Sequence, residues 1–397
     1  MHVLIIHNHY AQYGGEDKVL EHQVQLLRSK GHKVSLFSKH NDNIKDFSLI
    51  DKIKLFKSGY SNAYIENELE DIIRNEKPDI AHVHNIYPII SPLVYKVLHE
   101  NNIPIVQTLH NYRFICPNGL MYNNNKICRK CLDTNNLYNC FYDKCYRNNY
   151  LESFWYADII SQAYKKGYFE KVDKFIALNP FMKNIMISKG FPENKLSVIP
   201  NFVDEKEIES VKKKDYFLFI GRLSEEKGVI QLVKSMEHLI NIELKIVGEG
   251  PLESEIKNYI KERNLENITL VGFKKGYEKN LLISESKGLI VPSQWYENFP
   301  TVVLEALSLG TLVIGSDIGG LSYMIDNGLN GLLFKPENLL DLAEKIKLIA
   351  EDDNLMQSLS SNAFRTYKRN YTPNSFYMNI MHLYKEILTS KTTKVGV

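Results

Sequence analysis

The chain has 397 residues, of which 44% are apolar and 24% are charged, and its formal net charge is only +2. A chain of this length is expected to form two domains rather than one core. So small a net charge gives no reason to expect a nucleic-acid partner. The sequence also lacks an uninterrupted apolar run of the roughly 18 residues that a membrane-spanning helix needs.

Residues 1–10, MHVLIIHNHY, lack the basic start and long apolar core of a signal peptide and predict a buried first strand. We therefore expect a cytoplasmic protein. The first 200 residues carry 25 basic and 20 acidic side chains. This small excess would suit peripheral association with the inner face of a membrane rich in anionic lipid, although an ordinary solvated surface is the simpler interpretation.

Short β-branched runs alternate with amphipathic helical patterns along the first half of the chain. The strands predicted there are 2–8, 32–38, 79–84, 103–109, 174–179 and 196–201. Between the first two, a helical pattern ends at Gly31. The second half repeats the alternation, with predicted strands 216–221, 243–248, 267–272, 288–293, 311–316 and 331–334. Strands that alternate with helices form parallel sheets, so we expect an α/β protein of two doubly wound, Rossmann-like domains.

We place the first domain at residues 1–203, with a cysteine-rich insertion at about 112–150, and the second at 204–371. The charged segment 201–215 is the expected linker, and residues 372–397 form a last helix that we expect to pack back on the first domain. Ligands of open parallel sheets lie beyond the carboxyl ends of the strands, and paired domains often bind them in the cleft across which they face each other. Residues that directly follow strands are therefore the best site candidates.

Two glycines and two cations follow predicted strands in this way. Gly14 and Gly15 come before the first helix, where a bare backbone and a helix N-terminus favour a phosphate, although a tight turn explains them equally well. The stretch GRLSEEKG places Arg222 and Lys227 on a loop after strand 216–221. Two cations at that position could hold a diphosphate, and an exposed basic pair is the alternative.

Further candidates follow the next strands. Gly248 lies in a turn after strand 243–248 that suits a phosphate or a base. Pro300 is expected in the first turn of a helix that runs to about Ser308, which would leave the amides of Thr301 and Val302 for phosphate oxygens.

The stretch VPSQWYENFPTVVLEALSLG, residues 291–310, also holds two glutamates, Glu297 and Glu305, separated by an almost wholly apolar run. A carboxylate among Val, Leu and Ala is costly to bury unless something compensates its charge. Glu297 lies on the loop before the expected helix and Glu305 on its second turn, so both could reach one cleft. We expect them to accept hydrogen bonds from vicinal hydroxyls, Glu297 from a hexose and Glu305 from a ribose.

Three histidines lie on or after strands of the first domain. His110 follows the fourth strand and faces the cleft by the strand-end rule, with a structural role as the alternative. His82 and His84 alternate along the third strand and share a face. Their spacing suits a metal, but no nearby residue completes a site. We therefore interpret them as strand histidines with satisfied hydrogen bonds, and keep His84 as a contact for an acceptor substrate.

Four motifs in this order resemble glycosyltransferase family 4, sugar-nucleotide enzymes of the GT-B fold: PNFVD at 200–204, GRLSEEKG, VGEGP and the E-x7-E pair Glu297 and Glu305. The resemblance covers most of the chain. WYENFP, HNYRFICPNG and the cysteine cluster resemble a subset associated with surface polysaccharide assembly, such as capsule. The usual E-G-F-G turn of the family is replaced here by Asn298, Phe299 and Pro300 after the first glutamate.

The resemblance implies a retaining transfer of a hexose from a nucleoside-diphosphate sugar, with UDP as the expected carrier. The implied acceptor is a saccharide, expected to be polyprenyl-linked. Arg222 and Lys227 would neutralise the diphosphate, while Glu297 would orient the transferred sugar. The resemblance also implies that Glu305 binds the ribose and that His110 lies near the transferred sugar.

The remaining implied contacts are the amides of Thr301 and Val302 with the phosphates and the loop at Gly272 and Phe273 with the base. We expect no cofactor or metal in the transfer, because the chain has no D-x-D motif and two cations stand where a divalent ion would act. Two alternatives stay open. One is another enzyme of this fold, a sugar phosphorylase or a nucleotide-sugar epimerase, and the other is a non-catalytic protein that binds nucleotide sugars.

All five cysteines lie within 30 residues, and Cys128 and Cys131 resemble half of a zinc knuckle. From the subset that the chain resembles, we favour Cys116, Cys128, Cys131 and Cys145 as ligands of a structural zinc, with Cys140 to spare. Cys140 in place of Cys116 is the main rival. The segment is rich in Asn and poor in apolar residues, so a metal would supply folding free energy, and free thiols are the alternative.

Overall fold

The computed structural model describes residues 1–10, 14–41, 63–205 and 211–395. The predicted linker 201–215 lies partly outside the described residues. The chain divides into two compact units, each made of more than one segment. The first comprises Met1–Met121, Cys128–Pro200 and Phe376–Val397, and the second comprises Tyr122–Ile127 and Asn201–Ser375.

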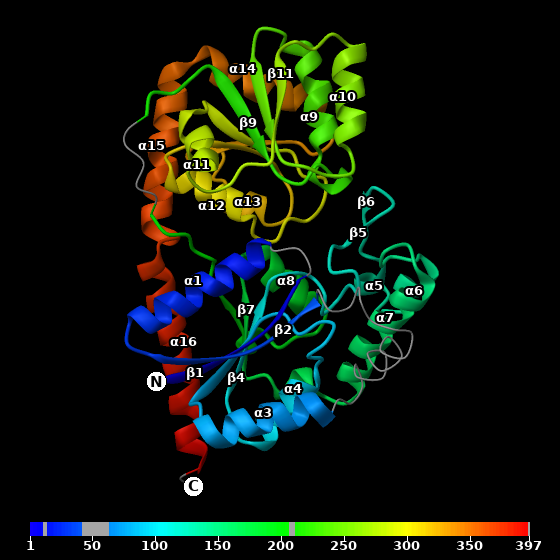
Figure 1. Cartoon of the computed structure of the whole chain (residues 1–397), viewed down its shortest axis with the longest axis vertical. Helices are drawn as coiled ribbons and strands as arrows, with labels where there is room; N and C mark the ends of the chain where they lie inside the picture. Colours follow the sequence, from blue (N-terminus) through cyan, green and yellow to red (C-terminus); the bar gives the residue numbers. More distant parts are fainter. Residues whose placement is uncertain (11–13, 42–62, 206–210, 396–397) are drawn as a thin grey trace. The chain divides into compact units, whose positions relative to one another are not determined.

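The first unit is built on a six-stranded sheet in the order β2-β1-β3-β4-β7-β8, in which every neighbouring pair is parallel (Figure 1). Its strands are β1 (His2–His9), β2 (Lys33–His40), β3 (Ile80–Val83), β4 (Ile105–Leu109), β7 (Lys174–Ala177) and β8 (Leu196–Val198). They confirm the six strands predicted for the first half. The strand order reverses direction between β1 and β3, so a ligand is expected beyond the carboxyl ends of these two strands.

The helices of the first unit connect these strands or follow them. They are α1 (Gly15–Ser29), α3 (Ala63–Glu76), α4 (Leu93–Glu100), α5 (Lys130–Asp133), α6 (Asn139–Tyr142), α7 (Tyr150–Lys165) and α8 (Pro180–Ser188). The core of the sheet is strand β1, whose Val3, Leu4, Ile5 and Ile6 are fully buried. A central strand that is covered by helices on both faces must be apolar throughout, and this explains the unbroken run VLII.

The second unit repeats the plan with the order β11-β10-β9-β12-β13-β14, again parallel throughout. Its strands are β9 (Tyr216–Ile220), β10 (Glu243–Val247), β11 (Ile268–Gly272), β12 (Gly288–Val291), β13 (Val313–Ser316) and β14 (Gly331–Phe334), as predicted. Its helices are α9 (Val229–Ser235), α10 (Glu253–Glu262), α11 (Gly276–Glu285), α12 (Thr301–Ser308), α13 (Leu321–Met324), α14 (Leu339–Glu351) and α15 (Asp353–Asn370). The strand order reverses between β9 and β12.

Two further elements lie outside this plan. An antiparallel pair of short strands, β5 (Tyr122–Asn123) and β6 (Lys126–Ile127), interrupts the first unit within the cysteine-rich segment. The last helix, α16 (Pro373–Val395), starts at the predicted proline, and its residues from Phe376 onward belong to the first unit. Its Tyr384 is fully buried, with the hydroxyl 2.6 Å from Nδ1 of His82.

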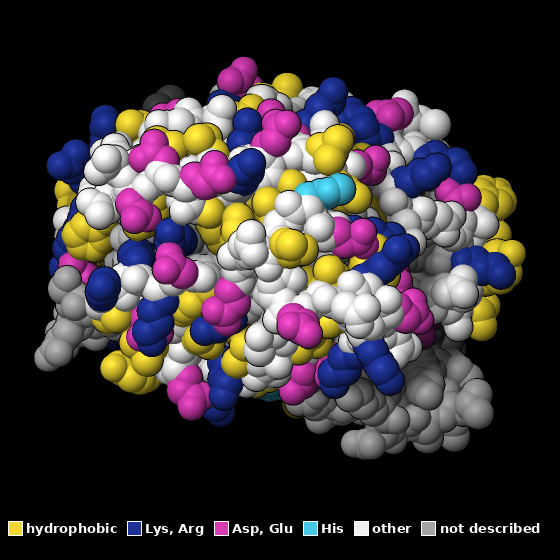
Figure 2. All heavy atoms as spheres, turned by 90° about the horizontal axis from the view of Figure 1, so that it is seen from above, with side chains coloured by type: hydrophobic (Ala, Val, Ile, Leu, Met, Phe, Trp, Pro, Cys, Tyr) yellow, Lys and Arg dark blue, Asp and Glu magenta, His cyan; other side chains and the backbone are white. Residues whose placement is uncertain are grey.

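The surface of the protein matches its small net charge. On the face drawn in Figure 2, Lys and Arg side chains are interspersed with Asp and Glu side chains. No helix in the described ranges combines the length and the apolar character that crossing a membrane requires.

Candidate active site

The strand-end loops after β9 and β12 lie side by side because β9 and β12 are neighbours in the sheet. Gly228, in the loop after β9, has φ +69°, and a Cβ atom there would lie 1.8 Å from the carbonyl oxygen of Pro292 after β12. Only glycine permits such an approach. This contact brings Lys227, which directly precedes Gly228, to the loop that carries Glu297.

Lys227 forms an ion pair with Glu297. The Nζ of Lys227 donates to Oε1 of Glu297 at 2.6 Å, and the Ser293 hydroxyl donates to the same oxygen at 2.7 Å. The Glu297 carboxylate is thus buried but not isolated, with its side chain 5% exposed beside a lysine that is 26% exposed. The backbone of Glu297 is also fixed, because its carbonyl oxygen accepts a 2.7 Å hydrogen bond from the amide of Gly320.

Arg222 begins the same loop but points away from the core, and its side chain is exposed. The next residue, Leu223, is fully buried, and its amide donates to the carbonyl of Glu249 at 3.0 Å. This anchor holds the backbone and leaves the guanidinium to solvent. The loop therefore presents one exposed cation, Arg222, a few residues from Lys227, whose charge is already shared with Glu297.

Glu305 has a partner that sequence reasoning missed. Its side chain is 4% exposed on α12, and Lys279 of α11 donates to both carboxylate oxygens at 2.7 Å. The cost of burying a carboxylate indicated that some group must compensate it. Lys279 lies 26 positions away on another helix, however, and nothing in the local pattern singles it out.

The start of α12 differs slightly from the prediction. Pro300 is the N-cap, with extended backbone at φ −67° and ψ 118°, rather than a residue of the first turn. The helix begins at Thr301 and ends at Ser308. Val303 bonds back to the Pro300 carbonyl at 3.1 Å, so Thr301 and Val302 supply the first two amides of the helix.

The remaining predicted residues of the second unit lie at the ends of β10 and β11. Gly248 has φ +142°, and a Cβ there would lie 1.9 Å from the carbonyl oxygen of Gly221. Close packing of neighbouring strand ends therefore requires this glycine, whether or not a ligand binds there. Gly272 ends β11, and the Phe273 ring that follows it is 63% exposed.

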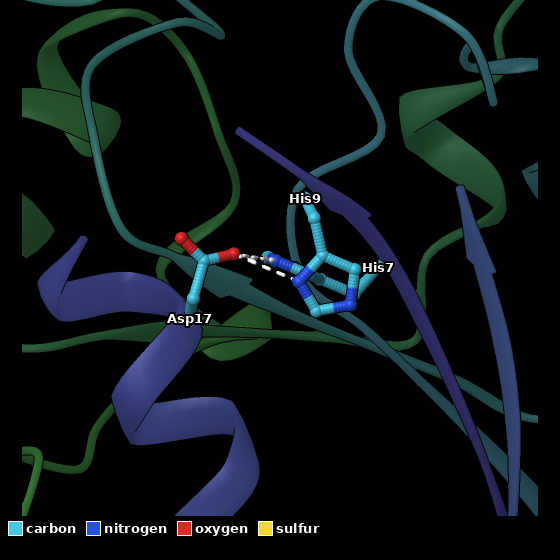
Figure 3. A group of neighbouring side chains, drawn as sticks. All are labelled: His7, His9 and Asp17. Carbon is cyan, nitrogen blue, oxygen red and sulfur yellow. Dashed lines mark hydrogen bonds and ion pairs between the residues drawn. The ribbon is translucent and has the colours of Figure 1, made fainter. Parts of the chain in front are cut away.

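In the first unit, the side chain of Asp17 on α1 points toward His7 and His9 of β1 (Figure 3). One carboxylate oxygen accepts from His7 Nε2 at 3.1 Å and from His9 Nδ1 at 2.9 Å, and the other accepts from the Gly14 amide at 3.0 Å. Burial alone would raise the pKa of Asp17, but these hydrogen bonds hold it well below its usual value. The ligand atoms of His7, His9 and Asp17 lie within 4.8 Å of one another, as in metal sites. Their mutual hydrogen bonds already account for the arrangement.

The three predicted histidines stack across neighbouring strands. His82 lies 2.6 Å from the Thr108 hydroxyl through Nε2 and 2.6 Å from the Tyr384 hydroxyl through Nδ1. Both ring nitrogens are therefore satisfied, as expected. The ring of His84 stacks on His82 with centroids 4.4 Å apart, and its Nδ1 lies 2.8 Å from Nε2 of His110.

Burial dominates the protonation of these rings. It lowers the pKa of His82 and of His110 to about 3, and the pKa of His84 is also well below its usual value. The stack is therefore neutral at physiological pH, and one proton is shared between His84 and His110. Together with Glu16 and Arg113, these two histidines line a pocket in the first unit.

The cysteines gather without forming disulfides. Burial raises the pKa of Cys116 to about 11, and Cys145 and Cys128 raise it further by smaller amounts. Cys140, the predicted spare, forms a hydrogen bond with Cys145. Within the described ranges, no three cysteine sulfurs lie within 4.8 Å of one another. A tetrahedral zinc site would therefore need rotation of these cysteine side chains.

Comparison with solved structures identifies the architecture. A glycosyltransferase from Rickettsia africae superposes with a TM-score of 0.69 at 20% identity, covering 98% of each chain. Anabaena Alr3699/HepE, solved in complex with UDP, superposes with a TM-score of 0.68 at 15% identity, over 97% of this chain and 100% of that one. The protein thus has the two-domain α/β fold of GT-B glycosyltransferases.

Sequence comparison identifies the family. Residues 13–207 match the model of Glycosyltransferase Family 4, and residues 202–366 match that of Glycosyl transferases group 1. An uncharacterized glycosyltransferase of Methanocaldococcus jannaschii, MJ1178, is 24% identical over 98% of this chain and 99% of its own. The N,N'-diacetylbacillosaminyl-diphospho-undecaprenol alpha-1,3-N-acetylgalactosaminyltransferase of Campylobacter jejuni is 27% identical over 58% of this chain and 64% of its own. The chain belongs to these families and is a glycosyltransferase.

Proposed function

We propose that the protein transfers a hexose, with retention of configuration, from a UDP-sugar to a polyprenyl-linked saccharide in surface polysaccharide assembly. The observation that carries this proposal is the Lys227–Glu297 pair at the strand-order reversal of the second unit, with the exposed Arg222 on the same loop as Lys227. The lipid-linked acceptor named for the Campylobacter relative and the UDP bound by the Anabaena protein support the choice of substrates.

The proposed chemistry rests on fixed charge. As the bond between the sugar and the diphosphate breaks, negative charge grows on the departing phosphate, and Arg222 and Lys227 would stabilise it. Preorganised charges of this kind need no rearrangement during the reaction and commonly supply the largest part of catalysis. We propose that no metal ion takes part in the transfer, because Arg222 and Lys227 would stabilise the departing diphosphate as a divalent ion would.

Glu297 would position the transferred sugar. Its Oε1 is engaged by Lys227 and Ser293, so Oε2 is the oxygen that would accept a sugar hydroxyl. The same lysine would then link the two parts of the donor, because it contacts the Glu297 carboxylate and would lie beside the diphosphate. A misplacement of the sugar by even about 1 Å is costly for such a reaction.

The other proposed contacts are less direct. Glu305 would bind the ribose while its charge stays balanced by Lys279, and the amides of Thr301 and Val302 would add to the phosphate site. The loop at Gly272 and Phe273 would lie against the base. On the first unit, Gly14 and Gly15 would approach a phosphate, and His110 and His84 would contact the sugars.

The proposal is tested by measuring the release of nucleoside diphosphate. A thermal-shift screen of UDP-, GDP- and dTDP-sugars identifies the donor, because a ligand that binds only the folded state raises the melting temperature. With that donor, Arg222→Ala and Glu297→Ala should each lower turnover by at least about 100-fold, while Lys234→Ala, an exposed lysine on α9, should not. Full turnover in both site variants would refute the assignment. Pyridoxal absorbance would instead indicate a phosphorylase, and conversion of the donor without any acceptor would indicate an epimerase.

A further inference from the structure

A buried arginine in the first unit forms no ion pair with the residues that the structure describes. Arg113 lies in the turn after β4 and is only 8% exposed. Its guanidinium carbon lies 4.8 Å from the ring centroid of Tyr156, 5.6 Å from that of Tyr87 and 5.8 Å from that of Tyr146. Within the described ranges, Nε and Nη1 of Arg113 are buried and donate to no acceptor.

The contacts of Arg113 with the rings neither neutralise its charge nor satisfy its N–H groups. A guanidinium stays charged at any physiological pH, and buried charges are normally paired with an opposite charge and hydrogen-bonded. Aromatic rings attract a cation through their faces, but they do not satisfy its N–H groups as an oxygen does. The Tyr146 and Tyr156 hydroxyls lie 3.2 Å apart and bond to each other. The three tyrosine rings therefore hold the guanidinium of Arg113 in place and leave its Nε and Nη1 hydrogens available to a ligand.

Other unsatisfied polar atoms face the same pocket. Glu16, His84, Tyr87, His110 and Arg113 all line it. The buried Tyr87 hydroxyl and the buried His84 Nε2 find no hydrogen-bond partner within the described part of the chain. Unsatisfied polar atoms from the loops after β3 and β4 thus line one cavity, together with the buried Oε1 of Glu16, which also finds no hydrogen-bond partner among the described residues.

Glu16 is the acidic residue of the pocket lining, but it does not neutralise Arg113. No ion pair joins the two among the described residues, and burial, together with the charge of Asp17, raises the pKa of Glu16 to about 8. The Tyr10 hydroxyl also donates to the Glu16 carboxyl group. Burial thus favours the neutral form of this carboxyl group, although the charge of Arg113 acts in the opposite direction, and no described carboxylate forms an ion pair with the guanidinium.

We propose that this pocket binds an oxyanion of the acceptor, either the carboxylate of an acidic sugar or a phosphate, with Arg113 as its cationic ligand and the Tyr87 hydroxyl as a second donor. Only the statement that the oxyanion belongs to the acceptor rests on the proposed function. A neutral sugar hydroxyl would leave the buried charge uncompensated, whereas an oxyanion would satisfy both the charge and the donors.

Binding to the full-length protein, measured by calorimetry, tests this inference without requiring turnover. The probes are methyl glucuronide, glucose 1-phosphate and the neutral methyl glucoside. We expect at least one of the two anionic probes to bind at least about 30-fold more tightly than the neutral one, the ratio expected for a desolvated charge pair. The anion that binds identifies the source as carboxylate or phosphate.

Three variants locate the site. Arg113→Gln should abolish the preference for the anionic probe. Tyr87→Phe, which removes one hydroxyl from a ring that stays in place, should weaken binding by about 3- to 10-fold without loss of folding. The matched control is Arg147→Gln, because Arg147 also contacts the Tyr146 ring, at 5.3 Å, but its side chain is 67% exposed. This control should bind as the wild type does.

The inference is wrong if neither anionic probe is preferred by the wild type, or if the preference survives in both folded Arg113→Gln and Tyr87→Phe. Should Arg113→Gln fail to fold, the Tyr87→Phe result decides alone. Nucleoside diphosphate release from the donor, measured on the same preparations, keeps the two proposals apart. Turnover without a preference for the anionic probes would refute only the proposal that the pocket binds an oxyanion. Anion binding without turnover would refute only the proposed transfer reaction.

Discussion

The ion pair between Lys227 and Glu297 can be tested by removing its charges separately and together. Lys227→Ala would leave the Glu297 carboxylate, whose side chain is 5% exposed, without its cationic partner. The Ser293 hydroxyl would still donate to it. Breaking a fully buried pair costs about 3–5 kcal/mol. Because Lys227 is 26% exposed, water recovers part of this, and we expect a loss of about 2–3 kcal/mol in the free energy of unfolding.

The double variant Lys227→Ala/Glu297→Gln separates the structural role of the pair from its catalytic role. Glutamine keeps the size of the side chain and an oxygen for Ser293 but carries no charge. The double variant should therefore be at least about 1 kcal/mol more stable than Lys227→Ala alone. Its rate of nucleoside diphosphate release should nevertheless stay at least about 100-fold below that of the wild type, because the stabilising cation is still missing.

Denaturant unfolding and turnover on the same preparations measure both effects. Lys257→Ala is the control, since Lys257 and Glu253 also lie 2.6 Å apart but with side chains 59% and 37% exposed, and it should change stability by less than about 0.5 kcal/mol. Equal stability of the single and double variants would show that the ion pair does not hold Glu297. Recovered turnover in the double variant would show that Lys227 acts only on the fold.

Three further predictions concern other parts of the chain. Lys279→Ala removes both hydrogen bonds from Nζ to the buried carboxylate of α12 and should lower the free energy of unfolding by about 2–3 kcal/mol, so an unchanged urea midpoint would contradict that role. Elemental analysis should find about one zinc per chain, retained in Cys140→Ser but lost in Cys131→Ser, and a metal-free wild type would assign free thiols instead. Stability should fall as the pH is lowered from about 7 to 5, because burial lowers the pKa of His82 to about 3 and the unfolded chain, with its ordinary pKa near 6.5, takes up the proton first. This contribution is complete above about pH 6.5, and melting curves of the wild type and His82→Gln that show the same pH slope would refute it.

The strands could be predicted because each is a local pattern. Buried parallel strands are short apolar runs bounded by turn residues, and all twelve expected strands occur. The ends are less well defined locally: the run expected at 196–201 forms a strand only at Leu196–Val198. The Ile199 amide still donates to the carbonyl of Ala177 at 3.0 Å, but Pro200, which follows it, has no N–H to continue the ladder.

The site could be predicted in part. The rule that ligand residues follow strands selected Arg222, Lys227 and Glu297 as candidates, and the structure places all three in the loops after β9 and β12. The rule does not reveal that Lys227 and Glu297 are already paired, since their contact depends on the close approach of two loops at Gly228. Lys279 was missed for the same reason, as it meets its carboxylate across two helices.

The unpaired arginine shows this limit most clearly. As part of the motif HNYR, Arg113 carries no sign of burial, and its three tyrosine neighbours come from positions 87, 146 and 156. Whether a charge is compensated is a property of all the groups around it, and these come from distant segments.

The amino-acid sequence by itself determined the two parallel α/β sheets and the strand ends that carry the candidate site residues, because burial periodicity and turn residues act over a few positions. Only the tertiary structure decided which charges meet: Lys227 with Glu297, Lys279 with Glu305, and Arg113 with no carboxylate among the described residues. Electrostatic pairing depends on distances of a few ångströms between residues far apart in the chain, and only the folded backbone sets those distances.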